Sequence, residues 1–267
     1  MKSGFISIIG RPNVGKSTLL NAILGEKIAI TTEKPQTTRN VIRGIYTDDE
    51  AQIVFIDTPG IHKPRTKLGS YMTDSAVNTF KEVDAVLFLV DDSIEKGPGD
   101  KFITEMLQNV DTPKYLIINK TDILGPEKYK EIFEEYNNMG IFDGIFGISA
   151  RENWNVNMVI REMKAIMPEG PQYFPSDMVT DHPERFIVSE ILREKVLLYL
   201  EDEVPHGVAI EIESFEEEEN ITRISAVIYC EKKSHKGIII GKGGRKLKGI
   251  GKSAREEIEA LLGSKVF

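Results

Sequence analysis

The sequence is poor in cysteine and has no long hydrophobic run. Cys230 is the only cysteine in 267 residues, which excludes an internal disulfide and any metal site built from thiolates alone. A reducing, cytoplasmic setting is therefore expected. The apolar run after Lys2 ends at Ile9, which is too short for the core of a signal peptide. No stretch approaches the roughly 20 apolar residues of a membrane span, although peripheral contact with the inner face of a cell membrane stays open.

The rest of the composition is that of an ordinary soluble protein, but its charge is unevenly distributed. Hydrophobic residues make up 40% and charged residues 28% of a chain whose length predicts about two domains. The formal net charge of −8 does not by itself indicate a nucleic-acid partner. Between Glu231 and Lys252, however, eight residues are basic and one is acidic. Such a local excess of positive charge is typical of phosphate-binding surfaces.

The most informative stretch is the glycine-bounded loop from Gly10 to Ser17. Its sequence, GRPNVGKS, follows an apolar run over 5–9 and precedes good helix formers over 18–24. A Walker A phosphate-binding loop requires this order of strand, loop and helix, because converging backbone N–H groups and the helix start bind phosphate oxygens. We expect Lys16 to reach the β- and γ-phosphates and Ser17 to hold Mg²⁺. The alternative, a plain glycine turn, has a chance of about 1% from average residue usage.

Apolar runs alternate with helical patterns over the first 168 residues. Strands are predicted at 5–9, 41–46, 52–56, 85–90, 114–118 and 144–148, and helices at 18–24, 68–80, 101–109, 126–139 and 156–167. A short turn joins the second and third strands, so they should pair as an antiparallel hairpin. The alternation otherwise predicts an α/β fold with a mostly parallel sheet and helices on both faces. Ligands bind at the carboxyl ends of such strands, where the polar motifs of this region lie.

Four further motifs follow the phosphate loop in a fixed order. They are Thr37-Thr38, Asp57-Thr58-Pro59-Gly60, Asn119-Lys120-Thr121-Asp122 and Ser149-Ala150. Each alone could be an ordinary loop or turn. In this order after a Walker A loop, over residues 4–167, they resemble the motif set of the translation-factor-like GTPases. The resemblance implies a bound GTP or GDP, held by Asn13, Val14, Gly15, Lys16, Ser17, Thr18, Asp57, Thr58, Pro59, Gly60, Asn119, Lys120, Asp122, Ser149 and Ala150.

The same resemblance implies how the base is selected. The carboxylate of Asp122 would accept hydrogen bonds from the guanine N1–H and exocyclic amine, a pair of donors that adenine does not present. Asn119 and Lys120 would brace the pocket, and the N–H of Ala150 would meet the guanine oxygen.

At the phosphate end, the resemblance implies a metal site and the catalytic residues. Ser17 and Thr38 would hold Mg²⁺, and Asp57 would hold it through water. The N–H of Gly60 would contact the γ-phosphate. The catalytic residues are therefore expected to be Lys16, Thr38, Gly60 and Asn13.

One position departs from the small signalling GTPases, which carry a glutamine after the glycine of Asp-x-x-Gly to orient the attacking water. Ile61 stands there, and its apolar side chain can neither orient nor activate water. Intrinsic hydrolysis should therefore be slow. In a subset of these GTPases an asparagine at the place of Asn13 helps to bind K⁺, so we expect K⁺-stimulated hydrolysis, with carbonyls of Thr32 or Lys34 as helpers. The alternative is that Asn13 only stabilises the turn.

Prolines at 168, 171, 175 and 183 mark a linker, predicted at 169–183. It would join a GTPase domain, 1–168, to a second domain, 184–267. The second domain is predicted to contain a helix over 184–200, strands over 208–215 and 222–230, a glycine loop and a final helix. The acidic run at 216–219 is most simply a solvated hairpin loop.

The glycine loop of the second domain predicts RNA binding. A bare G-x-x-G arises about once by chance in such a chain, but this one follows two strands, precedes a helix and is surrounded by lysines. It resembles the loop of a type II KH domain, which clamps about four nucleotides of single-stranded nucleic acid. The apolar residues 238–240 would line the base groove or pack in the core. RNA contacts are expected from Lys236, Gly237, Ile240, Gly241, Lys242, Gly243, Gly244, Arg245 and Lys246.

The two domains together resemble the Era-type GTPases, which act in bacterial small-ribosomal-subunit assembly. Segments 10–17, 36–39, 203–206 and 237–244 carry the match, which covers nearly the whole chain. It implies a monomer that binds 16S ribosomal RNA near its 3′ end, not DNA, and acts in assembly of the 30S subunit, with GTP favouring the RNA-bound state. Family members continue past Phe267 through a third KH strand and a helix, so we expect an incomplete KH sheet.

Two other functions stay open at this point. An RNA-binding protein with a structural, non-hydrolysed guanine nucleotide would also fit the isoleucine at position 61. A tRNA-modification GTPase of the same K⁺-dependent group is disfavoured, because the expected C-terminal cysteine and flanking helical domain are missing from the sequence.

Overall fold

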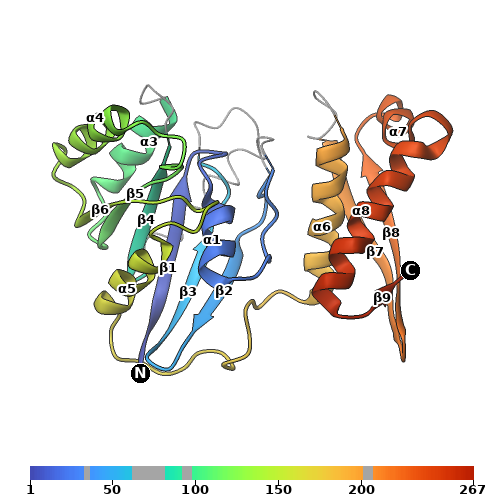
Figure 1. The fold of residues 1–267 in the computed structure, drawn as a ribbon, viewed down its shortest axis with the longest axis horizontal. Coiled ribbons are helices and arrows are strands. Elements are labelled where there is room, and N and C mark those ends of the chain that lie inside the picture. Colours follow the sequence, from blue (N-terminus) through green and yellow to red (C-terminus); the bar gives the residue numbers. More distant parts are fainter. Residues whose placement is uncertain (33–36, 62–81, 92–97, 201–206) are drawn as a thin grey trace. The chain divides into compact units, whose positions relative to one another are not determined.

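A computed structural model describes residues 1–32, 37–61, 82–91, 98–200 and 207–267. The helix predicted over 68–80, residues Lys34 and Gln36, and the segment 203–206 lie outside these ranges. The chain divides into two compact units, shown in Figure 1. Unit 1 comprises Met1–Ala29 and Pro35–Asp181, and unit 2 comprises Ile30–Lys34 and His182–Phe267.

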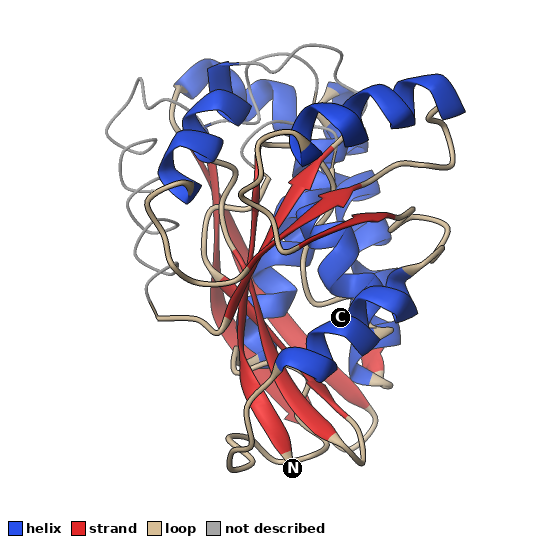
Figure 2. Ribbon diagram, turned by 90° about the vertical axis from the view of Figure 1, so that its left-hand side faces the viewer, coloured by secondary structure: helices blue, strands red, loops and turns tan. Residues whose placement is uncertain are grey.

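Unit 1 is built on a twisted sheet whose described strands number six (Figure 2). They are β1 (Lys2–Gly10), β2 (Ile42–Thr47), β3 (Ala51–Asp57), β4 (Ala85–Val90), β5 (Lys114–Ile118) and β6 (Gly144–Gly147). Their order is β2-β3-β1-β4-β5-β6, and β2 runs antiparallel to β3 while the other pairs are parallel. This confirms the predicted hairpin and mostly parallel sheet. The order reverses at β1, so ligands are expected at the carboxyl ends of β1 and β4.

Helices cover both faces of this sheet. On one face, α3 (Pro98–Leu107) and α4 (Pro126–Asn137) pack against a cluster that includes Val86, Phe88 and Ile61. Successive residues of a strand point to opposite faces, so the fully buried Leu87 and Leu89 point to the other side. There, α1 (Lys16–Leu24) contacts β1, β2, β3 and α5 (Val156–Ile166). Cover on both faces explains why the central strands are continuous apolar runs.

Residues 169–181, most of the predicted linker, are attached to unit 1. The fully buried side chain of Gln52 accepts hydrogen bonds from the N–H groups of Tyr173 and Phe174 and donates one to the Phe174 carbonyl (2.9 Å). Farther along, the Ile45 N–H of edge strand β2 donates to the Val179 carbonyl at 2.8 Å. We call this segment the strap. Its main-chain hydrogen bonds need no apolar periodicity, which is why the sequence pattern did not predict its attachment.

Unit 2 packs three described helices on an antiparallel hairpin. Its elements are α6 (Glu184–Tyr199), β7 (Val208–Glu218), β8 (Ile221–Cys230), α7 (Lys233–Ile240), a 3₁₀ turn (Lys242–Gly244), α8 (Arg245–Leu262) and β9 (Lys265–Val266). β9 pairs in parallel with β8 and makes a third, short strand. A buried cluster of Val196, Leu200, Val208, Ile239 and Ile250 joins the helices to β7.

Helix α7 was not predicted from the sequence. It contains Gly237 and a run of three isoleucines, residues that favour strands or loops over helices. Ile239 is buried in the core, whereas Ile238 is 43% and Ile240 36% exposed, so one of the three packs inward and its two neighbours face solvent. Among the described residues, no helix is both long and apolar enough to cross a lipid bilayer.

Candidate functional site

The loop after β1 has the backbone of a phosphate cradle. Gly15 has a φ of 101°, and a Cβ atom there would lie 2.2 Å from the Nδ2 atom of Asn119. Asn13 is also in the left-handed region, with a φ of 67°. Helix α1 begins directly after the loop, at Lys16. When left-handed residues precede the first turn of a helix, several backbone N–H groups point toward one place. This is the geometry that binds phosphate.

The lysine of this loop is buried at the phosphate end. Its Nζ atom donates to the carbonyl of Arg11 at 2.9 Å. Burial lowers the pKa of Lys16 to about 8, although the neighbouring Asp57 carboxylate acts in the opposite direction. Thr18 follows in the first turn of α1. A buried cation here suits an anionic ligand, whose charge would restore the ordinary pKa.

Three oxygen-bearing side chains converge beside this lysine. The Oγ atom of Ser17 donates to Asp57 Oδ2 at 2.6 Å and lies 2.9 Å from Thr38 Oγ1. Asp57 is fully buried, and burial raises the pKa of its carboxyl to about 6. Its other oxygen, Oδ1, has no hydrogen-bond partner among the described residues. Hydroxyl and carboxylate oxygens are the ligands that Mg²⁺ prefers, so these residues fit that ion.

The Asp57-Thr58-Pro59-Gly60 segment lies against the phosphate loop. The Thr58 hydroxyl donates to the carbonyl of Ile8 at 2.9 Å, and a Cβ atom on Gly60 would lie 2.6 Å from the backbone nitrogen of Pro12. Ile61 donates its N–H to the carbonyl of Gly10 at 3.0 Å, and its side chain is fully buried in the cluster under α3 and α4. That side chain is therefore a core residue.

The motifs expected to bind the base meet at Asn119. Its Nδ2 atom donates to the Val14 carbonyl at 2.8 Å, and its Oδ1 atom accepts the Ala150 N–H at 2.9 Å. One side chain thus joins the phosphate loop to the Ser149-Ala150 loop. That second loop is closed by two backbone hydrogen bonds between Ser149 and Trp154.

The base end also holds an unsatisfied carboxylate oxygen. Oδ1 of Asp122 is buried and has no hydrogen-bond partner among the described residues. Buried polar atoms are nearly always paired, so this atom points to a ligand that donates hydrogen bonds. The guanine N1–H and amine, expected from the sequence, are donors of the right kind.

The glycine loop of unit 2 links α7 to α8. Gly241, Gly243 and Gly244 have φ values of 71°, 63° and 74°, so this turn requires residues without a Cβ atom. Lys242 between them is exposed, as are the predicted RNA contacts Lys236, Gly237, Ile240 and Arg245, whereas Lys246 is half-buried. Exposed basic side chains thus surround a backbone that carries no Cβ atom at three positions.

Comparisons with known proteins match both units of the chain to known families. A family model described as a 50S ribosome-binding GTPase matches residues 5–120, and one described as a KH domain matches residues 203–267. GTPase Era of Alkaliphilus metalliredigens (strain QYMF) is 60% identical over 268 residues, which cover 100% of this chain and 91% of the relative. The chain belongs to the GTPase Era family. GTPase Era of Clostridioides difficile (strain 630) is 57% identical, covering 99% of this chain and 90% of that protein.

Solved Era structures have the same fold over the full chain. Era in complex with MgGDPNP and nucleotides 1506–1542 of 16S ribosomal RNA aligns with a TM-score of 0.93 at 38% identity, covering 100% of this chain and 91% of that one. An Aquifex aeolicus Era variant bound to GDP·AlF4⁻ aligns with a TM-score of 0.91 at 38% identity, covering 100% and 92%. The protein is a GTPase with a C-terminal KH domain, which confirms the predicted fold class, family and activity.

In this Era-family chain, four charged residues that include one predicted site residue form a network around two buried carboxylates. Asp91, just after β4, accepts hydrogen bonds from Arg11 Nη2 at 3.2 Å and from Lys120 Nζ at 2.7 Å. The Nε atom of Arg11 also lies 2.7 Å from Asp100 Oδ2 in the first turn of α3. Asp91 was not predicted from the sequence, although it directly follows a buried strand, as the Asp57 and Asn119 motifs do.

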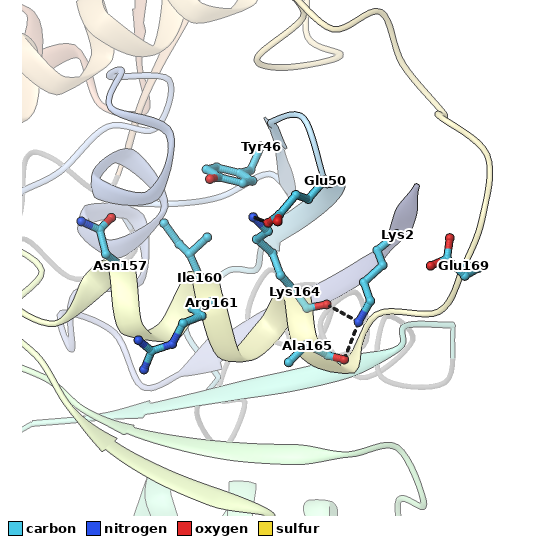
Figure 3. A pocket seen from close by; sticks show the side chains of 9 residues that line it. All are labelled: Lys2, Tyr46, Glu50, Asn157, Ile160, Arg161, Lys164, Ala165 and Glu169. Carbon is cyan, nitrogen blue, oxygen red and sulfur yellow. Dashed lines mark hydrogen bonds and ion pairs between the residues drawn. The ribbon is translucent and has the colours of Figure 1, made fainter.

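A separate cavity of about 600 Å³ lies at the opposite end of the Era-family GTPase unit (Figure 3). It is lined by the start of β1, the β2–β3 hairpin and one side of α5 from Asn157 to Ala165. Lys2 Nζ donates to the carbonyls of Lys164 and Ala165 at the end of α5, and Lys164 pairs with Asp48 and Glu50. The two hydrogen bonds from Lys2 place a cation at the C-terminus of α5, where the helix dipole favours positive charge. The part of the cavity around Lys2 lies away from the phosphate loop, because that loop follows the other end of β1.

Proposed function

We propose that this protein is a GTP-driven switch that binds 16S ribosomal RNA near its 3′ end and acts in assembly of the 30S subunit. One observation carries the proposal. A single chain holds a glycine loop among exposed lysines and a nucleotide site in which buried oxygens of Asp57 and Asp122 have no hydrogen-bond partner in the described part of the chain. An Era structure with MgGDPNP and 16S nucleotides aligns over all of this chain, which supports the same pair of ligands here.

In the nucleotide site, each group has a proposed task. The backbone from Asn13 to Thr18 and the ammonium of Lys16 bind the phosphates. Ser17, Thr38 and Asp57 hold Mg²⁺, which neutralises phosphate charge when bound, and the Gly60 N–H contacts the γ-phosphate. At the base, Asp122 accepts from guanine and Ala150 donates to it, while Asn119, Lys120 and Ser149 keep the two loops in place. The proximity of Ser17, Asp57 and Thr38 supports the metal site.

For hydrolysis, we propose that K⁺ bound by Asn13 supplies positive charge at the phosphates. The side chain of Ile61 is buried in the core and cannot act on water, so charge stabilisation must come from elsewhere. Asn13 has a φ of 67°, a conformation that asparagine tolerates well, and this is the competing explanation for its presence.

A glycine substitution separates the two explanations. Asn13→Gly keeps the left-handed turn and removes the side-chain ligand, so it should abolish the difference between hydrolysis rates in KCl and NaCl while leaving GDP binding in place. A wild-type rate that is equal in K⁺ and Na⁺ would reject the K⁺ site. Asn153 is also a left-handed asparagine, with a φ of 55°, and it is exposed and belongs to no predicted motif, so Asn153→Gly serves as the matched control.

For RNA, we propose that the exposed glycine loop binds the backbone and that the lysines around it supply affinity. Replacing Lys236 and Lys242 with alanine should weaken binding to a 16S 3′-end oligonucleotide and reduce its salt dependence by about one or two released counterions. Lys265→Ala, an exposed lysine on β9, is the control. Unchanged affinity in the double variant would reject the loop as the RNA site.

The deciding experiment is crosslinking of the protein to cellular RNA with GTP or GDP bound, followed by sequencing. Enrichment of the 16S 3′ end with GTP supports the proposal, and enrichment of transfer RNA overturns it. A nucleotide that survives single-turnover incubation with RNA would indicate a structural role for GTP. The expected cytoplasmic location follows from the ribosomal partner, and the peripheral membrane contact stays a prediction that vesicle flotation tests.

A further inference from the structure

The position of Asp91 places it between the two halves of the nucleotide site. It directly follows β4, and β4 lies between β1, which leads into the phosphate loop, and β5, which leads into the Asn119-Lys120-Thr121-Asp122 motif. All three strands are parallel, so their carboxyl ends meet at one edge of the sheet. Any side chain that leaves β4 at this edge stands between the loops that would bind the phosphates and the base.

Asp91 contacts both of these loops. One carboxylate oxygen accepts from Arg11 of the phosphate loop and the other accepts from Lys120 of the base motif. The carboxylate is 8% exposed, while the Lys120 side chain is one-third exposed. A buried carboxylate is costly unless it is paired, so the arrangement in which both cations face Asp91 is strongly preferred over arrangements with either cation turned away.

The surroundings of Arg11 hold this network in place. Asp100 binds the guanidinium from the first turn of α3, where a negative charge also suits the helix N-terminus. The aliphatic stem of Arg11 is confined as well, since a Cβ atom on Gly99 would lie 2.9 Å from Arg11 Cδ. Two cations and two carboxylates therefore form a balanced set that is anchored on α3.

Lys120 requires such an anchor. Its φ of 63° is unusual for a residue other than glycine and is maintained only where the surroundings enforce it. The neighbouring Asn119 is already tied to the Val14 carbonyl. The base motif is thus joined to the phosphate loop twice, once through Asn119 and once through Lys120, Asp91 and Arg11.

We propose that Asp91 is a positioning residue for the guanine nucleotide, which sets the spacing of the phosphate loop and the base motif through Arg11 and Lys120. A nucleotide must contact both loops at once, so a preset spacing removes part of the ordering cost of binding. The inference rests on the proposed roles of these loops in binding GTP and GDP.

The test is the affinity of the full chain for GDP, by stopped-flow release of a fluorescent GDP analogue and by calorimetry. Asp91→Asn keeps the shape of the side chain and removes its charge, and should raise the Kd for GDP about tenfold. In metal sites, loss of a residue that orients a ligand residue weakens binding by about 10-fold to 100-fold, and the expected effect is the lower of these values. The increase should lie in the dissociation rate. Asp100→Asn is the matched control, because it removes a carboxylate from Arg11 without touching Lys120, and should change the Kd less than threefold.

A double-mutant cycle distinguishes positioning from general weakening. If Asp91 acts through Lys120, the double variant should have nearly the same Kd for GDP as the single variant Lys120→Gln. The proposal would be overturned if the fold-increases in Kd of the two single variants multiply in the double variant. A Kd of Asp91→Asn within twofold of the wild type would overturn it as well. Failure of both Asp91→Asn and Asp91→Ser to fold would assign the network to stability and overturn it too. A wild-type chain that prefers ADP to GDP would instead reject the base pocket itself.

Discussion

Asn119 offers the sharpest test of how the nucleotide loops are held. Its side chain is 3% exposed and makes two hydrogen bonds, to the Val14 carbonyl and from the Ala150 N–H. Asn119→Ala leaves both backbone groups buried without a partner. Each such group costs about 1–3 kcal/mol, so the free energy of unfolding of unit 1 should fall by about 2–6 kcal/mol.

The sole tryptophan makes the measurement specific to unit 1. Trp154 closes the 149–154 loop by two backbone hydrogen bonds with Ser149, so its fluorescence follows the element that Asn119 supports. Urea titrations of the nucleotide-free protein at pH 7 give the change directly. The control is Asn109→Ala, in which an exposed asparagine also donates to a backbone carbonyl and the expected change is about 0.5 kcal/mol or less.

Two outcomes would refute this reasoning. A loss below about 1 kcal/mol for Asn119→Ala would mean that water or rearranged backbone satisfies both groups. Asn119→Asp gives a second check, because a carboxylate can still accept from Ala150 but cannot donate to Val14. It should be no more stable than the alanine variant, and wild-type stability in it would show that the bond to Val14 contributes nothing.

Two further predictions concern unit 1 away from the nucleotide. Gln52→Ala removes the three hydrogen bonds between the Gln52 side chain and the strap, and should lower the free energy of unfolding by about 2–4 kcal/mol and speed proteolysis within 172–181. Gln172→Ala, at an exposed amide that also donates to a strap carbonyl, should do neither. Burial acts to raise the pKa of Asp48, but hydrogen bonds led by that from Lys164 outweigh it and hold the pKa at about 2, against 3.8 for a free carboxyl. Its contribution to stability is therefore present above about pH 4 and lost as the pH falls through 2, so acid should lower the urea midpoint of the wild type more than that of Asp48→Asn.

The elements that carry the nucleotide motifs could be predicted because local sequence and tertiary structure agree there. The run 5–9, the loop from Gly10 and the helix from Lys16 each have the pattern of the element that forms. The convergence of Ser17 and Asp57 followed from the rule that strand ends meet at one edge. Parallel topology thus turns positions far apart in sequence into neighbours that can be named in advance.

What could not be predicted depends on contacts that leave no periodic pattern. The strap is hydrogen-bonded in part by main-chain groups and by Gln52, whose burial nothing in its sequence neighbourhood indicates. Helix α7 forms because Ile239 packs into the core, against the local preference of its residues. The pairing of Asp91 with Arg11 and Lys120 required side-chain directions at three loops, which spacing along the chain does not specify.

The strap has a consequence for solubility. β2 is an edge strand, and an open edge of a sheet is a template for pairing with another chain. Val179 and Thr180 occupy that edge through the N–H of Ile45 and the carbonyl of Arg43. A GTPase unit produced alone should therefore end after Asp181. A shorter version ending at 168 would expose the edge of β2 and the side chain of Gln52 to solvent, and should self-associate.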